Sequence, residues 1–213
     1  MDNRYLGKEL SVDSREYLDV CRLRYQTFTI YLNEHSELVE YIDGIPSLKP
    51  CKYDKHSVIF AVYNEKECIG TIRLIIRNSK KNHFLEIEES SICKLKPFVH
   101  DDYKVAEVGR LVVDKKYRTQ ANVVFMLFNY VTQYSIKNHL DYLVCEAPVH
   151  LSKHYSRLGW EVVEENKPWS VNEQILLKHL LFDIRGHRMR AKCYGYMMGM
   201  LVKNPHFYKV FFH

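Results

Sequence analysis

Four charged residues in apolar segments could together move a proton and bind an anion. Glu107 and Arg110 lie in the run VAEVGRLVVD, Arg73 lies in CIGTIRLIIR, and Arg24 lies in an amphipathic segment near the start of the chain. A partly buried carboxylate has a raised pKa and accepts a proton near neutral pH. A guanidinium binds a carboxylate in a two-pronged way. Glu107 is therefore a candidate general base, and the arginines are candidates for holding a substrate carboxylate.

Each of these residues also has a purely structural interpretation. Glu107 could be an ordinary strand glutamate paired with Lys or Arg. Strand alternation places Glu107 and Arg110 on opposite faces unless a β-bulge shifts the register, and Gly109 between them suggests such a bulge. Without direct substrate contact, Arg110 would connect the sheet to the first helix through an acid such as Asp54. Arg73 is the favoured arginine for the acceptor side.

The hydrophobic periodicity predicts the elements that must position these residues. Helices are expected over 14–32, 82–92, 121–137, 150–158 and 186–203. Strands are expected over 57–63, 68–77, 105–114, 141–146, 160–163 and 174–182. A surface loop is expected where Gly44, Pro46 and Pro50 follow the first helix. Antiparallel strands followed by a strand–helix–strand unit predict an α/β (α+β three-layer) fold.

Composition limits the classes of protein that remain. The chain has 213 residues, 46% apolar and 27% charged, which suits one domain over 1–213 with a substantial core. The six cysteines form no CxxC pair, so no metal site is expected. No secretory signal or membrane span is evident, which favours a cytoplasmic protein. The formal charge of +5 favours an acidic partner, but no nucleic-acid signature accompanies it.

Three segments, in this order of elements, resemble the GNAT acyltransferase fold. They are VAEVGRLVVDKKYRTQANVVFML (105–127), HYSRLGWEVV (154–163) and ECIGTIRLI (67–75). The resemblance spans about 55–165. An N-terminal helix and loop (1–50) precede this core, and a C-terminal strand and helix (166–213) follow it. The resemblance implies a mixed, mostly antiparallel central sheet flanked by helices. It also implies that the backbone of the loop in the first segment, Val113 to Ala121 with Thr119 and Gln120, holds the pantetheine part of an acyl thioester. Lys115, Lys116 and Arg118 crowd the start of the following helix, so they are a candidate dock for an acidic carrier protein, or else a solvated charged turn.

A narrower resemblance comes from RLRYQTF (22–28), GTIRL (70–74) and AEVGRLVV (106–113). These segments are similar to the bacterial autoinducer (acyl-homoserine-lactone) synthases and the long-chain N-acyl amino acid synthases. The resemblance implies that the substrate site contains Arg24, Phe28, Arg73, Glu107, Arg110 and Leu111. It also implies that acyl carrier protein is the acyl donor.

Two departures from that pattern refine the expected substrates. Lactone synthases have a tryptophan where this chain has Thr29–Leu32, and paired acids where it has Asp54 alone. Those groups shape the site for S-adenosylmethionine, so an amino acid or other small amine is the expected acceptor. The loop Arg118–Val123 lacks the glycines that let a loop wrap tightly around a pyrophosphate. A phosphopantetheine arm carries a single phosphate, so it needs fewer close contacts from this loop.

Acyl transfer to an amine requires a base, donors for the oxyanion and a proton for the leaving thiolate. Glu107 is the predicted base, and the N–H groups of Gly109–Leu111 are the predicted oxyanion donors. Tyr155, at the family's tyrosine position, is the predicted acid, or else it anchors a helix to the sheet.

The expected function is N-acylation with a medium or long acyl chain. No tightly bound cofactor is expected; acyl-phosphopantetheine on acyl carrier protein, or acyl-CoA, is the co-substrate. Two alternatives remain open: an acetyl-CoA-dependent N-acetyltransferase, and a non-catalytic acyl-sensing module.

Overall fold

The computed structural model describes residues 5–32, 39–89, 102–118, 121–157, 159–163, 169–170 and 176–185. An eight-stranded sheet has the order β1-β4-β5-β6-β7-β10-β8, with β9 paired to β10. β6 and β7 are parallel, and the other described pairs are antiparallel. The strands of this sheet are β1 (Tyr5–Leu10), β4 (Ser57–Asn64), β5 (Glu67–Ile76), β6 (Val105–Val113), β7 (Tyr142–Pro148), β8 (Glu161–Val162), β9 (Trp169–Ser170) and β10 (Leu176–Asp183).

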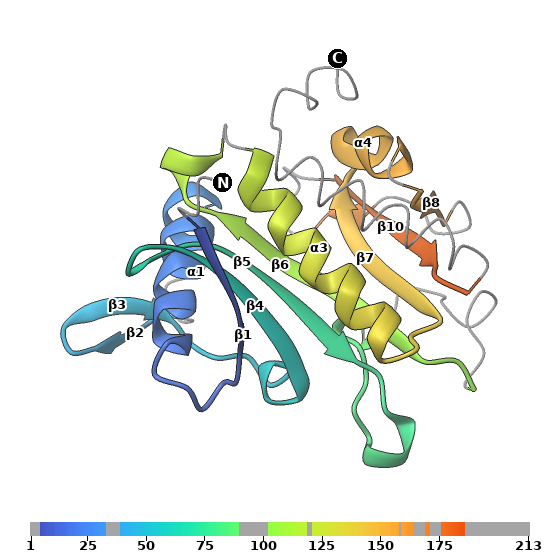
Figure 1. The fold of residues 1–213 in the computed structure, drawn as a ribbon, viewed down its shortest axis with the longest axis horizontal. Coiled ribbons are helices and arrows are strands. Elements are labelled where there is room, and N and C mark those ends of the chain that lie inside the picture. Colours follow the sequence, from blue (N-terminus) through green and yellow to red (C-terminus); the bar gives the residue numbers. More distant parts are fainter. Residues whose placement is uncertain are drawn as a thin grey trace.

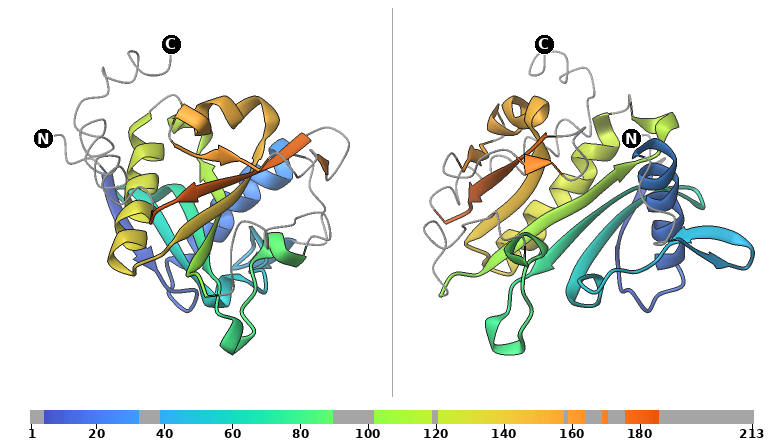
Figure 2. Two further views of the ribbon diagram at one scale, coloured as in Figure 1. Left: turned by 90° about the vertical axis from the view of Figure 1, so that its right-hand side faces the viewer. Right: turned by 180° about the vertical axis from the view of Figure 1, so that it is seen from behind.

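Helices cover both faces of the sheet, which confirms the predicted three-layer α/β fold (Figures 1 and 2). The helices are α1 (Tyr17–Leu32), α2 (Glu86–Glu89), α3 (Ala121–Lys137) and α4 (Ser152–Arg157). α3 packs Val123, Leu127 and Val131 against one face. α1 packs Val20 and Leu23 against the opposite face, where α2 also buries Ile87.

The close packing of α3 on the sheet depends on a glycine in β5. A Cβ atom on Gly70 would lie 2.6 Å from Val123 Cγ1 and 3.2 Å from Leu127 Cδ1. Only a residue without a side chain lets the helix approach this strand so closely. The helix therefore sits at a fixed distance from the strands that carry the candidate site.

Several predicted elements are confirmed. α3 occupies the predicted range 121–137, and β4 and β5 form the predicted hairpin, with Asn64 opposite Glu67 across a two-residue turn. The short helix expected within 82–92 is α2. β1, which pairs with β4 along its whole length, was not predicted, because YLGKEL has little apolar alternation.

The prediction of a plain surface loop after the first helix is wrong. The chain there forms a second, two-stranded sheet of β2 (Val39–Ile42) and β3 (Ile45–Leu48). Asp43 and Gly44 make its turn with φ of 53° and 74°. An Asp-Gly dipeptide between apolar residues is a strong hairpin signal, and it could have identified this element.

The predicted helix over 186–203 lies outside the described residues. Among the helices that the structure describes, none has the length and apolar character needed to cross a membrane.

Candidate active site

The site is organised by an irregularity in β6. Thr71 of β5 lies opposite Val112, and Arg73 lies opposite Gly109, so three steps along β6 match two along β5. Arg110 within this bulge has a φ of 51°, a left-handed conformation that is uncommon outside glycine. The bulge predicted near Gly109 is confirmed, but the left-handed residue is Arg110 and not the glycine.

The bulge places Arg110 on the same side of the sheet as Glu107. Glu86 of α2 connects the strands there: its Oε1 accepts a hydrogen bond from Arg110 Nη2 at 3.1 Å, and its Oε2 accepts one from Arg73 Nη2. The Ile87 backbone N–H donates to Glu107 Oε2 at 2.9 Å. α2 therefore contacts three of the predicted site residues, Arg73, Glu107 and Arg110.

Glu107 is the buried carboxyl group at the centre of this arrangement, with 5% of the residue exposed. Burial raises the pKa of Glu107 to about 7, although the hydrogen bond from the Ile87 N–H opposes this effect. The nearby charges of Glu86 and Glu146 raise the pKa further. Glu107 can thus accept and release a proton near neutral pH.

Asp54 is the centre of a second group of charged residues, which shares Arg73 with the first group. It accepts hydrogen bonds from Tyr17 Oη at 2.7 Å, from Arg24 Nη1 at 3.2 Å and from Arg73 Nη1 at 3.2 Å, and also from the Cys51 backbone N–H at 3.0 Å. Burial raises the pKa of Asp54, but its arginine and hydrogen-bond partners outweigh this and hold it at about 2. Asp54 stays ionised and fixes Arg24 and Arg73 in place.

The three arginines differ in how accessible they are. Arg24 and Arg73 are both buried, with 3% and 1% of each residue exposed. The Arg110 side chain is 28% exposed, and its guanidinium lies 5.4 Å from the centre of the Phe28 ring. Arg110 therefore connects the sheet to α1, as its structural interpretation predicted, but through Phe28 rather than through Asp54, and it also connects the sheet to α2 through Glu86.

β6 and β7 separate immediately beyond Glu107. Their parallel pairing covers Val105↔Tyr142, Ala106↔Leu143 and Glu107↔Val144, and Figure 1 shows the strands diverging from there. The predicted oxyanion donors, Gly109–Leu111, follow the last pair on β6. Leu111 is half-buried and Val113 is buried, both packed with the α3 side of the core.

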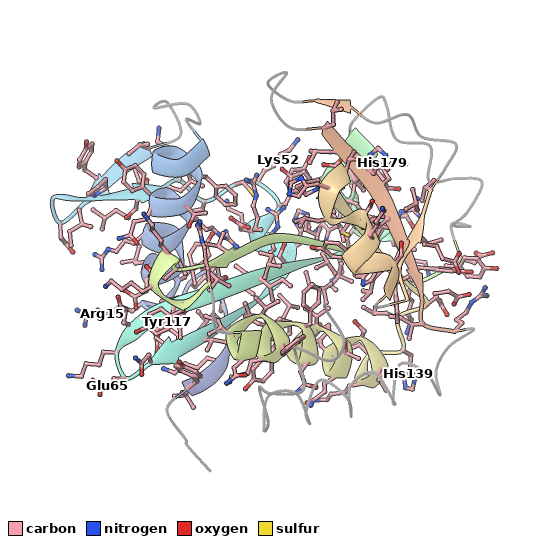
Figure 3. The ribbon with its side chains drawn as sticks, turned by 90° about the horizontal axis from the view of Figure 1, so that it is seen from above. Arg15, Lys52, Glu65, Tyr117, His139 and His179 are labelled. Carbon is pink, nitrogen blue, oxygen red and sulfur yellow. The ribbon has the colours of Figure 1, made fainter. Side chains whose placement is uncertain are left out.

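The predicted donor-binding turn follows β6. Figure 3 shows Tyr117 in this turn, at the end of β6 that points away from β10. Asp114 Oδ1 accepts from the Lys116 N–H at 2.8 Å, and Arg118 Nε donates to the Val113 carbonyl at 3.1 Å. Lys115, Lys116 and Arg118 are exposed. Thr119 and Gln120 lie outside the described residues, and Ala121 begins α3.

Tyr155 of α4 packs between two aromatic rings, 6.3 Å from that of Phe128 and 5.9 Å from that of Trp160. Burial raises the pKa of its hydroxyl well above the ordinary value. The hydroxyl thus stays protonated at neutral pH, as a general acid requires, while the ring contacts suit the anchoring role. Both interpretations of Tyr155 are compatible with this geometry.

Sequence reasoning missed three residues that hold the site together: Glu86, Tyr17 and Cys51. Glu86 begins the acid-rich segment EIEES within a predicted helix, and this was the available signal. Cys51 Sγ accepts a hydrogen bond from Arg73 Nη1 at 2.8 Å. Among the described residues, no three His, Cys, Asp or Glu side chains are grouped to hold a metal ion.

Comparison with known families gives one match over most of the chain. The model of the N-acyl amino acid synthase FeeM family matches residues 19–180. No curated protein matches the chain significantly.

Comparison with solved structures identifies similar folds at low sequence identity. FeeM, an N-acyl amino acid synthase from uncultured soil microbes, has 17% identity and a TM-score of 0.64, with 85% of this chain and 91% of FeeM covered. BjaI, a CoA-dependent acyl-homoserine lactone synthase solved with SAM and isopentyl-CoA, has 17% identity and a TM-score of 0.65 over 92% and 90%. An acyl-CoA N-acyltransferase from Pseudomonas aeruginosa has 16% identity and a TM-score of 0.53 over 84% and 97%.

Proposed function

Since this chain belongs to the FeeM family of N-acyl amino acid synthases, we propose that it transfers a medium or long acyl chain from acyl carrier protein to the amine of an amino acid. Family membership makes the chain an acyltransferase. We add to this the choice of acyl carrier protein as the donor and of an amino acid as the acceptor.

The observation that carries the proposal is the environment of Glu107. An amine attacks a thioester only after its ammonium form has lost a proton, so the enzyme needs a base that is half ionised near neutral pH. Burial raises the pKa of Glu107 to about 7. Glu107 is also the last β6 residue paired with β7, where the thioester would enter between the separating strands.

The charges around Glu107 support an acceptor that carries a carboxylate. Arg24, Arg73 and Arg110 bring three positive charges, and Asp54 and Glu86 bring two negative charges. The Arg110 side chain is 28% exposed, so its guanidinium can also meet a substrate carboxylate. We assign this contact to Arg110 rather than to Arg73, which the sequence favoured, because the side chains of Arg73 and Arg24 are buried against Asp54.

Acyl carrier protein is the favoured donor because of the turn after β6. Lys115, Lys116 and Arg118 are exposed there, and carrier proteins present an acidic helix that a basic cluster attracts. Acyl-CoA is the second candidate, because BjaI, a structure of similar fold, is described as CoA-dependent. Supplying the same acyl group on each donor to the purified enzyme distinguishes the two.

The first test is mass spectrometry of lipid extracts from bacterial cells that express the wild type or Glu107→Ala. A new N-acyl amino acid in the wild type alone is expected, and its mass identifies the acyl chain and the acceptor. The purified proteins are then assayed with acyl carrier protein and acyl-CoA donors, so that a missing host carrier does not hide the reaction. Equal product from both proteins, or none from the wild type in either assay, contradicts the proposal.

Arg110→Lys tests the acceptor contact. Lysine keeps the charge but loses the two-pronged geometry, so we expect KM for the amino acid to rise roughly 10-fold, equivalent to about 1.4 kcal/mol. KM for the acyl donor should not change. Arg77→Lys is the matched control, because Arg77 pairs with Glu88 at 2.9 Å outside the proposed site. An equal rise in both variants argues against the assignment.

A further inference from the structure

A second titratable pair lies on the Glu107 face of the sheet. His179 of β10 is directly opposite Glu146 of β7, and its Nε2 lies 3.0 Å from Glu146 Oε1. Figure 3 shows His179 on β10. The His179 side chain is fully buried, and within the described part of the chain its Nδ1 has no hydrogen-bond partner. Apart from the effect of the Glu146 charge on the pKa of Glu107, the pair has no part in the site described above.

The strand register places this pair beside Glu107. Glu107 lies opposite Val144, and Glu146 is two residues further along β7, so it points to the same side of the sheet. Its charge contributes to the raised pKa of Glu107. The other charged groups that affect Glu107 are Glu86 from α2 and Arg73 from β5. Glu107 and Glu146 thus flank the point where β6 and β7 separate.

The hydrogen bond defines which nitrogen of His179 is available. When Nε2–H donates to the Glu146 carboxylate, the neutral ring leaves Nδ1 as an acceptor. Burying such an acceptor without a partner costs about 1–3 kcal/mol, so an unpaired buried group requires an explanation. An imidazole that is oriented by a carboxylate and has a free lone pair is the arrangement of a general base.

The chemistry removes two protons from the same nitrogen. In the proposed reaction a C–N bond forms to the acyl carbon and the C–S bond breaks. The attacking nitrogen, which arrives as an ammonium, loses two protons; one ends on the thiolate sulfur and the other is released to solvent. Glu107 is a single carboxylate and holds one proton at a time.

We propose that the Glu146–His179 pair is the second proton acceptor of this reaction. His179 Nδ1 takes one of the two protons and releases its Nε2 proton to Glu146, while Glu107 takes the other proton and passes it to the leaving thiolate sulfur. The Glu146 side chain is 24% exposed, so it returns the proton to water. The inference rests on the proposed function, because it requires an acceptor that arrives as an ammonium.

The test compares kcat/KM from pH 7 to pH 9.5 for the wild type, Glu146→Gln and His179→Gln, with thiol release as the readout. Glu161→Gln is the matched control, because Glu161 is an exposed carboxylate on β8, next to β10. We expect both pair variants to be about 100-fold slower than the wild type at pH 7. This deficit should shrink at least tenfold as the amino acid loses its first proton to the solvent at higher pH.

The outcomes separate the inference from the proposed function. A structural defect would lower the rate by the same factor at every pH, and a constant deficit, or none, overturns the inference. Glu146→Gln retains an oxygen that can accept from His179, so it serves as the test even if His179→Gln does not fold. If the wild type itself forms no N-acyl amino acid, the proposed function fails and the inference fails with it.

Discussion

Two buried carboxyl groups in this protein have pKa values shifted in opposite directions. Glu107 accepts a hydrogen bond from the Ile87 N–H, and burial raises its pKa to about 7. Asp54 is also buried, but two arginines and a tyrosine hydroxyl hold its pKa at about 2. One carboxyl group is therefore available for proton transfer, and the other is a permanent negative charge that positions arginines.

The raised pKa of Glu107 should lower the stability of the folded protein at high pH. Its folded pKa of about 7 lies above the 4.5 of an unperturbed glutamate, so its favourable contribution is complete below pH 4.5 and is lost as pH rises through 7. Glu107→Gln removes this ionisation and keeps an acceptor for Ile87. Between pH 5 and pH 8, urea unfolding should therefore show the wild type losing about 1–3 kcal/mol relative to the variant. Parallel pH dependences for the two proteins would contradict this.

At the scale of elements, β6 determines the geometry of the site. Its bulge turns Arg110 toward α2, and its pairing with β7 ends at Glu107. The apolar runs and the glycine predicted the strand and its bulge, because both are local signals. The contacts of Glu86 with Arg73 and Arg110, 13 and 24 residues away, depend on how distant elements pack. No local pattern predicts them.

Two glycines on neighbouring strands should respond differently to the same substitution. Gly70→Ala places a methyl group against Val123 and Leu127, so we expect it to destabilise the fold by about 1–3 kcal/mol through overpacking. A Cβ atom on Gly109 would lie 3.6 Å from Arg73 Nη2 and 3.9 Å from Glu107 Oε1, which are ordinary contact distances, and the backbone there has a φ that alanine adopts. Urea unfolding should find Gly109→Ala within about 0.5–1 kcal/mol of the wild type, or more stable. Equal losses would mean that the bulge requires the glycine itself.

Across the whole molecule, four of the residues named from the resemblance, Arg24, Phe28, Arg73 and Arg110, come together in one network, whereas Leu111 packs with the α3 side of the core. Arg24 and Arg73 share Asp54, Arg73 and Arg110 share Glu86, and Arg110 lies over Phe28. The sequence alone could predict this set, but not which guanidinium remains accessible. Accessibility depends on burial by α1 and α2, which belongs to the folded molecule and not to any one segment.

Two of the basic residues that contribute to the formal charge of +5, Lys115 and Lys116, are exposed in the turn after β6. If acyl carrier protein docks there, Lys115→Glu combined with Lys116→Glu should raise KM for the carrier-bound donor roughly 10-fold at low salt. The effect should fade toward 1 M salt, where the Debye length shrinks from about 10 Å to about 3 Å. Lys137→Glu, at the opposite end of α3, is the matched control in a steady-state assay that varies both donor and salt. Because CoA lacks the acidic helix, KM for the same acyl group on CoA should change far less. A salt-independent rise, or an equal rise in the control, would place the docking surface elsewhere.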